Sequence, residues 1–338
     1  MTGCRVFRAI IFTLVIWNTI LNAEKTDEEV SLEYGNPKYL QSQKYMYSWT
    51  GPNALARSAL LERQEKLQYN CEEILRRDNV GNGTSFSPES FRNILVDEQH
   101  ELLYCYVPKV ACTNWKRVLM IATGKWPGND PLEIPADQAH SPGVFLRLSN
   151  YTASEIEKKL TSYDKLIVVR HPFERLLSAY RNKLEAKHER SSRYFQTRFG
   201  KKIIKKYRVN ATQESLQNGD DVTFREFVEF ITNDTENGTR NEHWRPIYEL
   251  CQPCIVNYNL VSKYETLVED ATEVLERMNV VSVNFPSKPP SNEPTSKKLD
   301  RYYSTLSYKQ LRKLEDLYKL DMKLFDYSLE DVLGFSLA

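Results

Sequence analysis

The chain has 338 residues, of which 41% are hydrophobic, and its 46 Lys and Arg residues nearly balance its 45 Asp and Glu residues. This composition excludes a disordered or collagen-like chain, and the length is enough for one large α/β domain or two smaller ones. The net charge of +1 argues against a protein that coats nucleic acid with its whole surface, so no nucleic-acid partner is expected.

The N-terminus has the charge pattern of a segment that directs a protein into the secretory pathway. Arg5 and Arg8 precede an uncharged apolar run over residues 9–23, and acidic residues follow it. The run is shorter than the roughly 20 residues of a membrane-spanning helix, so a cleaved signal peptide competes with a signal anchor. The anchor is favoured, because Leu21 suits a cleavage site poorly and apolar residues also precede Arg8. Residues 1–23 are therefore predicted to be a signal anchor or signal peptide.

Five Asn-x-Thr sequons support residence in the lumen of the secretory pathway, where asparagine is glycosylated. One or two would arise by chance, but five together with the N-terminal segment indicate lumenal exposure. The predicted glycosylation sites are Asn82, Asn150, Asn210, Asn233 and Asn237.

Cysteine usage fits the same compartment, because disulfides form in oxidising lumens. Beyond Cys4 in the N-terminal segment, five cysteines remain, so at least one thiol is free or intermolecular. Cys251 and Cys254 have the spacing of a zinc half-site, a redox pair or a local disulfide. The local disulfide is favoured, because the sequence contains no second CxxC and no HxxxH. No metal site is predicted.

A change in composition divides the chain into a predicted stem and a predicted folded domain. Residues 24–86 are polar, with a helical stretch near 53–75, and they predict a stem that holds the rest away from a membrane. Residues 87–338 form the predicted domain.

Three buried strands are predicted at 102–107, 166–169 and 260–264, and an amphipathic helix follows each. Because strands that alternate with helices form parallel sheets, the predicted fold class is α/β, with a central, mostly parallel sheet flanked by helices. Ligand sites in such folds lie at the carboxyl ends of the strands.

Caps and apolar spacing predict three further helices. Ser87 and Pro88 suit the start of a short amphipathic helix whose apolar face contains Phe91, Ile94 and Leu95. Thr223 and Glu226 form a capping box before another helix, and the apolar residues from 311 to 325 indicate a last one.

Two of the strand ends have side chains that suit phosphate groups. The first strand runs into Pro108–Thr113, where a helix start supplies N–H groups, Lys109 an ammonium and Thr113 a hydroxyl. The GxxxxGK[ST] pattern of a P-loop NTPase is absent. The second strand ends at Arg170, and Ser178 lies about two turns into the next helix, where its hydroxyl can face the same anion. Two anion sites, each at the carboxyl end of a strand, indicate a nucleotide that is phosphorylated at both ends.

Long motifs stand at these sites and beyond them. They are YCYVPKVACTNWKR at 104–117, VVRHPFERLLSAYRNK at 168–183, NEHW at 241–244 with LCQPC at 250–254, and KYETL at 263–267. They resemble the Golgi carbohydrate sulfotransferases of the HNK-1 sulfotransferase group, and among these the chondroitin 4-O-sulfotransferases most. The resemblance covers about residues 96–327 and implies a P-loop-like sulfotransferase fold.

The resemblance also implies a reaction and a location. The expected enzyme moves the sulfuryl group of PAPS (3′-phosphoadenosine 5′-phosphosulfate) to O4 of GalNAc in chondroitin or dermatan chains. It is expected to be a single-pass type II protein of the Golgi membrane, held by its N-terminal anchor, with residues 87–338 as a lumenal catalytic domain.

By the same resemblance, the loop at 108–114 holds the 5′-phosphosulfate of PAPS and residues 170–178 hold its 3′-phosphate. The implied donor-binding residues are Pro108, Lys109, Val110, Ala111, Cys112, Thr113, Asn114, Arg170, His171, Pro172, Phe173, Glu174, Arg175, Leu176, Leu177 and Ser178. The chain departs from the family at His171, where the closest members tend to have Glu. Donor binding should survive this change, because Arg170 is retained.

Sulfuryl transfer needs in-line geometry, a cation at the leaving phosphate and a base for the attacking hydroxyl. Lys109 is the candidate for the charge on the leaving oxygen. His140 is the preferred base, His243 is its rival, and a carboxylate such as Glu133 is the third choice. Imidazole is preferred, because its ordinary pKa of about 6.5 leaves it neutral and basic near Golgi pH.

A basic run predicts the surface that binds the acceptor. Residues 183–208 contain ten basic residues against two acidic ones, a local charge of +8, with aromatic residues between them. A solvated helix face is the usual explanation of such a run, but a groove for a glycosaminoglycan is favoured, because these are the polyanions of the secretory pathway. The predicted acceptor-binding residues are Lys201, Lys202, Lys205, Lys206 and Trp244, the last as a platform for a sugar ring.

Two alternatives stay open at this point. The first is the same reaction on another acceptor, either terminal GalNAc of N-glycans or glucuronate of HNK-1-type glycans. The second is a non-catalytic, secreted glycosaminoglycan-binding glycoprotein, which would keep the basic run but have no use for Lys109, Arg170 and Ser178.

Overall fold

The computed structural model describes residues 53–77, 87–186, 190–233, 240–287, 293 and 295–334. Contacts group Leu55–Ala338 into one compact unit, and nearly all of the described residues belong to it. The predicted N-terminal segment at 1–23 and two of the sequon asparagines, Asn82 and Asn237, lie outside the described residues. Among the residues that are described, no helix is both long enough and apolar enough to cross a bilayer.

A five-stranded sheet in the order β3-β1-β2-β4-β5 forms the centre of the unit. The strands are β1 (Ile94–Asp97), β2 (Leu102–Cys105), β3 (Leu146–Arg147), β4 (Asp164–Val169) and β5 (Leu260–Lys263). β2 pairs parallel with β4, and β4 with β5, while β1 is antiparallel to both β2 and β3. Four of the five strands therefore run in one direction, which confirms the mostly parallel sheet of the predicted α/β class.

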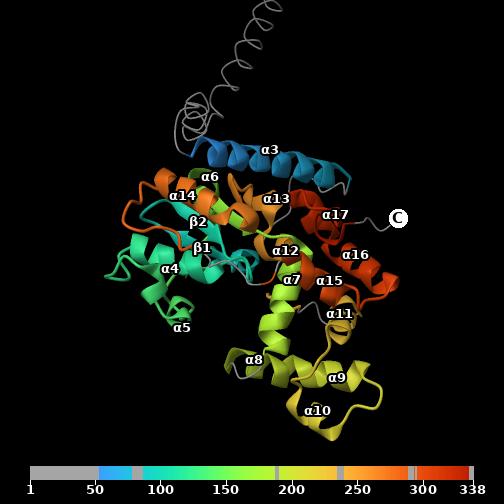
Figure 1. Cartoon of the computed structure of the whole chain (residues 1–338). Coiled ribbons are helices and arrows are strands. Elements are labelled where there is room, and N and C mark those ends of the chain that lie inside the picture. The colour runs from blue at the N-terminus through green and yellow to red at the C-terminus, as the bar shows by residue number, and fades with distance from the viewer. Residues whose placement is uncertain are drawn as a thin grey trace, which may run out of the picture. The chain divides into compact units, whose positions relative to one another are not determined.

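Helices and helical turns surround the sheet (Figure 1). The α-helices are α3 (Ala54–Arg77), α4 (Cys112–Ala122), α5 (Ala136–Ala139), α6 (Ala153–Ser162), α7 (Pro172–Tyr180), α8 (Arg190–Phe195), α9 (Lys201–Tyr207), α10 (Gln213–Asn218), α11 (Phe224–Asn233), α12 (Ile247–Cys251), α13 (Pro253–Val256), α14 (Leu267–Arg277), α15 (Thr295–Tyr303), α16 (Tyr308–Phe325) and α17 (Glu330–Leu333). Short 3-10 turns stand at Pro88–Phe91, Pro131–Glu133, Leu148–Asn150 and Tyr264–Thr266, and π-helical turns at Arg181–Glu185 and Gln196–Gly200. The helices predicted after each buried strand, after the Thr223 capping box and at 311–325 are all confirmed.

The helix predicted at the start of the domain is only partly correct. Ser87 accepts a hydrogen bond from the N–H of Glu89, as a cap should, but the helix is a single 3-10 turn. Ile94 and Leu95 instead belong to β1, opposite Cys105 and Tyr104 of β2. All four residues of β1 are buried, and its three apolar side chains, those of Ile94, Leu95 and Val96, cover both faces of the strand.

Two disulfides correct the predicted pairing of Cys251 with Cys254. Cys71 is bonded to Cys254, and Cys105 is bonded to Cys251. Gln252 separates α12 from α13 in the left-handed conformation (φ 47°), so the two cysteines lie on different short helices and reach different partners. The predicted odd thiol belongs to Cys112, which is buried.

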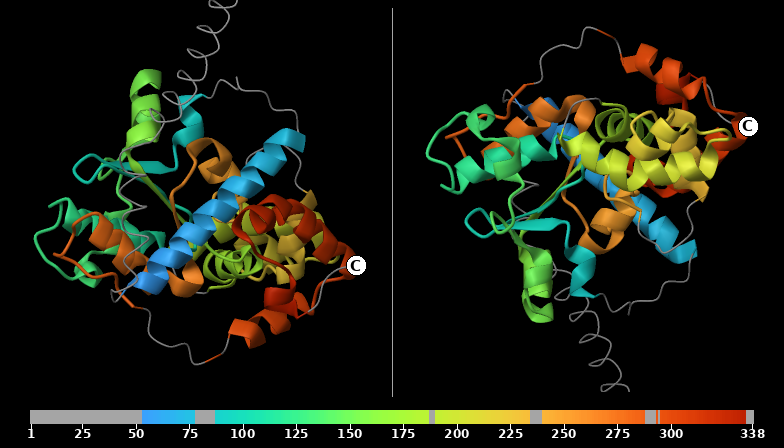
Figure 2. Two further views of the ribbon diagram at one scale, coloured as in Figure 1. Left: turned by 90° about the horizontal axis from the view of Figure 1, so that it is seen from above. Right: turned by 90° about the horizontal axis from the view of Figure 1, so that it is seen from below.

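The Cys71–Cys254 disulfide joins α3 to the rest of the compact unit, and ion pairs hold the same helix to α14. Arg57 Nε lies 2.8 Å from Glu273 Oε1, and Arg63 Nη1 lies 2.7 Å from Asp270 Oδ2, both on α14. Figures 1 and 2 show α3 lying across this side of the unit. The helix predicted near 53–75 is therefore confirmed as α3, which belongs to the compact unit that begins at Leu55.

The buried side chains form two hydrophobic clusters. One surrounds the sheet and includes Trp115 and Tyr104. The other is mostly helical and packs α7, α11, α15 and α16 around Phe173, Phe227 and Trp244. In Figure 1, α8, α9 and α10 lie beyond the far end of α7, on the side opposite α3.

Candidate active site

The loop between β2 and α4 has the shape of an anion cradle. Lys109 (φ 75°) and Ala111 (φ 64°) both have left-handed backbones, which is uncommon for residues with a Cβ and costs about 1–3 kcal/mol each. Val110 between them is fully buried and fixes the loop. The first α-helical bond runs from the N–H of Trp115 to the carbonyl of Ala111, so the N–H groups of the preceding turn point out of the helix start.

The two predicted anion sites lie side by side. Arg170 follows the last residue of β4, and its Nη1 is 3.5 Å from the carbonyl oxygen of Lys109. The Arg170 side chain also pairs with Glu174 at 3.0 Å and stacks over the ring of Tyr264 at 4.2 Å. Lys109 Nζ donates to Asn182 Oδ1 at 3.0 Å. Because β2 and β4 are neighbouring parallel strands, their carboxyl ends bring an ammonium and a guanidinium to one place.

Most residues of the segment 171–178 hold the site in position from behind, and few of them face it. His171 caps α7 by accepting the N–H of Phe173, and its Nε2 donates to the carbonyl of Ser328. Burial lowers the pKa of His171, which keeps the ring neutral. The side chains that remain partly exposed are those of Arg170, Glu174 and Ser178.

Four residues of this segment were predicted to bind the donor, but their side chains lie in the hydrophobic interior and cannot touch a ligand. They are Pro172, Phe173, Leu176 and Leu177.

Arg175 is buried as well, with 1% of its surface exposed, and has an organising role. Its guanidinium donates to the carbonyls of Pro108 at 3.0 Å, Arg245 at 2.7 Å and Glu242 at 2.8 Å. Arg175 therefore ties the anion loop to the NEHW segment, two parts of the chain that the sequence separates by over a hundred residues.

His140 lies directly on the start of α4. Its Nε2 is 2.9 Å from Thr113 Oγ1, and its Nδ1 is 3.2 Å from Lys116 Nζ. Desolvation, followed by the charges of Lys116, Lys183 and Arg117, lowers the pKa of His140 to about 4. The structure thus brings the preferred base to the predicted donor loop.

His243 stands at the same site, on the segment that Arg175 holds. Its Nδ1 is 2.7 Å from Asn241 Oδ1, and its ring meets the edge of Phe195 with centroids 5.0 Å apart. Burial, then the charges of Lys183 and Lys109, lower the pKa of His243 to about 2. Glu133, the third candidate base, is exposed at the end of the Pro131–Glu133 turn.

Trp244 corrects the predicted sugar platform. Only 2% of its surface is exposed, and its ring packs against Phe199 and Phe227 in the helical cluster. Because the ring faces the interior, it anchors His243 and cannot stack on an acceptor.

The basic run keeps only part of its predicted surface. Lys202, Lys205 and Lys206 are exposed on α9, and Lys201 is half-buried. Arg208, by contrast, pairs with Asp221 at 2.6 Å and Glu226 at 2.7 Å and so is neutralised.

Three sequon asparagines lie among the described residues. Asn150 and Asn210 are exposed, as an acceptor of a glycan must be. Asn233 is half-buried and bonded to Glu229 and Lys313. The described residues contain no cluster of three or more His, Cys, Asp or Glu side chains placed to hold a metal ion.

Several residues of the site were not singled out as candidates. Lys116, Lys183, Asn182 and Asn241 contact or surround the candidate side chains, and all four lie within the motifs at 104–117, 168–183 and 241–244. Membership in those motifs was their signal, and Lys116 also lies one helical turn after Thr113 on the same face.

Two neighbouring βα units bring a lysine, an arginine and a helix start together at one edge of the sheet, an arrangement that suits an anionic ligand. A profile of the sulfotransferase family matches residues 92–328. The chain therefore belongs to this family and is a sulfotransferase.

Its relatives narrow the class further. The chain is 44% identical to carbohydrate sulfotransferase 11 of Mus musculus over 250 residues, which cover 73% of this chain and 70% of the relative. It is 41% identical to carbohydrate sulfotransferase 14 of Danio rerio over 243 residues, 70% and 63% of the two chains. It is 35% identical to carbohydrate sulfotransferase 9 of Homo sapiens over 273 residues, which cover 79% of this chain and 60% of the relative. No solved structure matches significantly. The predicted class of carbohydrate sulfotransferase is thus confirmed.

Proposed function

We propose that this enzyme transfers the sulfuryl group of PAPS to O4 of GalNAc in chondroitin or dermatan chains. The observation that most supports a doubly phosphorylated donor is the contact between Arg170 and the backbone of Lys109, which joins two cationic strand ends into one site. The similarity to carbohydrate sulfotransferases 11 and 14 supports the class of acceptor.

Different residues are suited to the two phosphorylated ends of the donor. Lys109, Thr113 and the first N–H groups of α4 are suited to the 5′-phosphosulfate, since a helix start and an ammonium stabilise the charge that develops on the leaving oxygen. Arg170 and Ser178 are suited to the 3′-phosphate. Glu174 competes with that phosphate for the Arg170 guanidinium, so donor binding would exchange one partner of Arg170 for another.

The location belongs to the same proposal. Residues 1–23 would anchor the protein in the Golgi membrane as a type II protein, with the catalytic unit in the lumen. The two disulfides and the two exposed sequons support an oxidising, glycosylating compartment.

The decisive experiment offers the purified lumenal part radiolabelled PAPS and a panel of acceptors: desulfated chondroitin, desulfated dermatan, N-glycans with terminal GalNAc and glycans with terminal glucuronate. Disaccharide analysis of the labelled product then gives the sulfated position. Label at O4 of GalNAc in the first two acceptors is the expected result. Preferred transfer to either of the last two would replace the proposed acceptor, and transfer to none of them would overturn the proposal.

The exposed lysines of α9 give a second prediction. Replacing Lys202, Lys205 and Lys206 together with alanine should raise KM for chondroitin, because three cations that meet a polyanion are lost. The KM for PAPS and kcat should change little. The difference in KM for chondroitin between the parent and the triple variant should shrink as the salt concentration rises, because salt screens exposed charges. An unchanged KM for chondroitin at low salt would remove α9 from the acceptor surface.

The lowered pKa values of both histidines give a third prediction. A base with a lowered pKa stays unprotonated until the pH falls through that pKa, so kcat/KM should hold its value as the pH falls from about 7 to about 5. A histidine of ordinary pKa near 6.5 would lose most of the activity over that range. The test is the pH profile of kcat/KM for PAPS, which reports the enzyme before the donor binds, and a loss of activity centred near pH 6.5 would contradict the prediction.

A further inference from the structure

Both histidines of the site are hydrogen-bonded in ways that determine which ring nitrogen holds the proton. A neutral imidazole has one N–H and one lone pair, and only the lone pair can take a proton from an acceptor hydroxyl. The partners of His140 and His243 therefore distinguish a base from a hydrogen-bond donor.

Lys116 determines the tautomer of His140. An ammonium can only donate, so His140 Nδ1, 3.2 Å from Lys116 Nζ, is the acceptor. The ring proton must then lie on Nε2, which donates to Thr113 Oγ1 at 2.9 Å. Lys116 is 7% exposed and lies over the ring of Tyr106 at 4.3 Å, so its ammonium is held in place. His140 thus has no free lone pair, and the hydroxyl proton of Thr113 is left to point at the donor.

Asn241 determines the opposite tautomer for His243. The backbone N–H of His243 donates to Asn241 Oδ1 at 3.1 Å, which identifies that atom as the amide oxygen. The same oxygen is 2.7 Å from His243 Nδ1, so Nδ1 holds the proton. Nε2 is left with the lone pair.

We propose that His243 is the base that accepts the proton of the attacking hydroxyl, and that Lys116 is a positioning residue that makes His140 a hydrogen-bond donor toward Thr113 and the sulfate donor. The inference rests on the proposed function for the identity of the substrates, but the assignment of the two tautomers does not depend on the acceptor.

The step balances with the groups at hand. The acceptor oxygen forms its bond to sulfur while the bond from sulfur to the 5′-phosphate oxygen breaks, and that oxygen leaves with the electron pair. The hydroxyl proton moves to His243 Nε2, and the resulting imidazolium keeps its Nδ1–H on Asn241.

The charges that face the two rings explain why both are neutral before the donor binds. His243 faces Lys183, Lys109 and Arg175, and His140 faces Lys116, Lys183 and Arg117. An anionic donor among these cations offsets their field and so raises the basicity of His243 Nε2 when substrate is present.

The first test reads the tautomers directly. Proton–nitrogen correlation spectra of the ¹⁵N-histidine-labelled lumenal protein, assigned with the single variants His140→Gln and His243→Gln, should show Nε2–H for His140 and Nδ1–H for His243. In Lys116→Met, which keeps the length of the side chain but has no donor, the signal of His140 should shift toward a mixture of tautomers. Nδ1–H on His140 or Nε2–H on His243 in the unaltered protein would overturn the proposal.

The second test compares substitutions at each histidine. Gln at 140 can accept from Lys116 and donate to Thr113, so His140→Gln should rescue most of the loss caused by His140→Ala, which we expect as about a tenfold rise in KM for PAPS. Gln at 243 has no basic lone pair, so His243→Gln and His243→Ala should both lower kcat by about 10²–10⁴-fold, with an unchanged Kd for adenosine 3′,5′-bisphosphate. A KM for PAPS of His140→Gln as high as that of His140→Ala, or a near-normal kcat for His243→Gln, would overturn the proposal. If the unaltered enzyme sulfates no acceptor, the proposed function fails, and the tautomers alone decide this inference.

Discussion

Replacing Lys109 with alanine is expected to lower kcat for sulfuryl transfer by about 10²–10³-fold, the usual effect of removing one group that stabilises charge in a transition state. Lys109 follows β2 at the start of the anion loop, and its ammonium is held by Asn182 at 3.0 Å. No other lysine of the described residues stands inside this loop. The measurement is the initial rate with radiolabelled PAPS and desulfated chondroitin.

Alanine is the right replacement, because the loop needs its shape. Lys109 has φ 75°, and alanine retains the Cβ that makes this conformation costly, whereas glycine would relax it. The variant should therefore be secreted and folded like the parent. Lys319→Ala, which removes an exposed lysine from α16, is the matched control and should leave the rate unchanged. A Lys109→Ala enzyme within about threefold of the parent would mean that the charge on the leaving oxygen is stabilised elsewhere.

The sequence predicted the parts of the fold that depend on neighbouring residues. Buried strands and amphipathic helices have local periodicities, so β2, β4 and β5 and the helices after them were predictable. β1 was not, because the spacing of Phe91, Ile94 and Leu95 suits a helix equally well, and only pairing with Cys105 and Tyr104 decides between them.

Contacts between distant residues explain the remaining differences. The CxxC spacing suggested a local bond, but Cys71 and Cys105 approach from separate parts of the fold. Trp244 looked like a sugar platform until the helical cluster buried it, and Arg208 looked like part of a cationic surface until Asp221 and Glu226 neutralised it. Hydrophobic burial and ion pairing across the fold set these outcomes, and neither is visible in a sequence motif.

The near-zero net charge of the chain hides an uneven distribution of charge over the structure. Lys109, Lys116, Lys183 and Arg117 act on the two histidines, so the cations concentrate at one site. Acidic residues balance cations elsewhere, as Glu273 does for Arg57 and Asp270 for Arg63. A neutral protein can therefore attract a highly anionic donor at one place.

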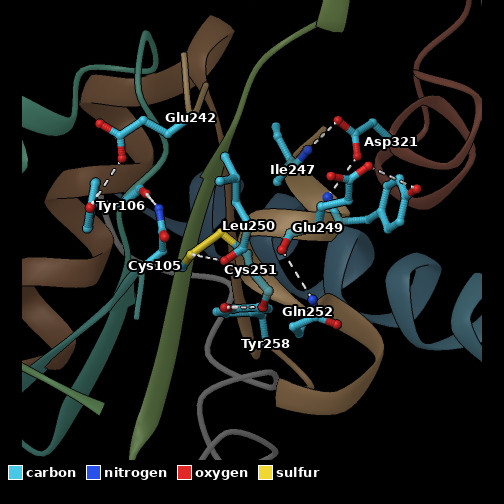
Figure 3. Close-up of a disulfide and its surroundings, with 12 residues drawn as sticks. Cys105, Tyr106, Glu242, Ile247, Glu249, Leu250, Cys251, Gln252, Tyr258 and Asp321 are labelled. Atoms are coloured by element: carbon cyan, nitrogen blue, oxygen red, sulfur yellow. Dashed lines mark hydrogen bonds between the residues drawn. A yellow bond between two sulfur atoms is a disulfide. The ribbon is translucent and has the colours of Figure 1, made fainter. Parts of the chain in front are cut away.

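Removing the Cys105–Cys251 disulfide is expected to have the largest effect on stability. The double variant Cys105→Ala/Cys251→Ala opens a loop with a sequence separation of 146 residues, for which chain entropy predicts a loss of about 5 kcal/mol in the free energy of unfolding. Figure 3 shows the bond between Cys105 and Cys251, which joins β2 to α12. Both cysteines are fully buried, so their loss also leaves a small cavity. Denaturant unfolding of the purified lumenal protein is the measurement.

The matched variant Cys71→Ala/Cys254→Ala should behave differently, although its sequence separation of 183 residues is greater. That bond fastens α3, which Arg57 and Arg63 also hold to α14, so its loss should release α3 locally before the sheet unfolds. Hydrogen exchange should then rise in residues 55–77 and stay slow in β2 and β4. The Cys105 variant should also lose activity, because its disulfide joins the strand that leads to Lys109 with the helix that follows His243. Equal stability losses in the two variants, with exchange rising everywhere in both, would show that α3 and the sheet unfold as one unit.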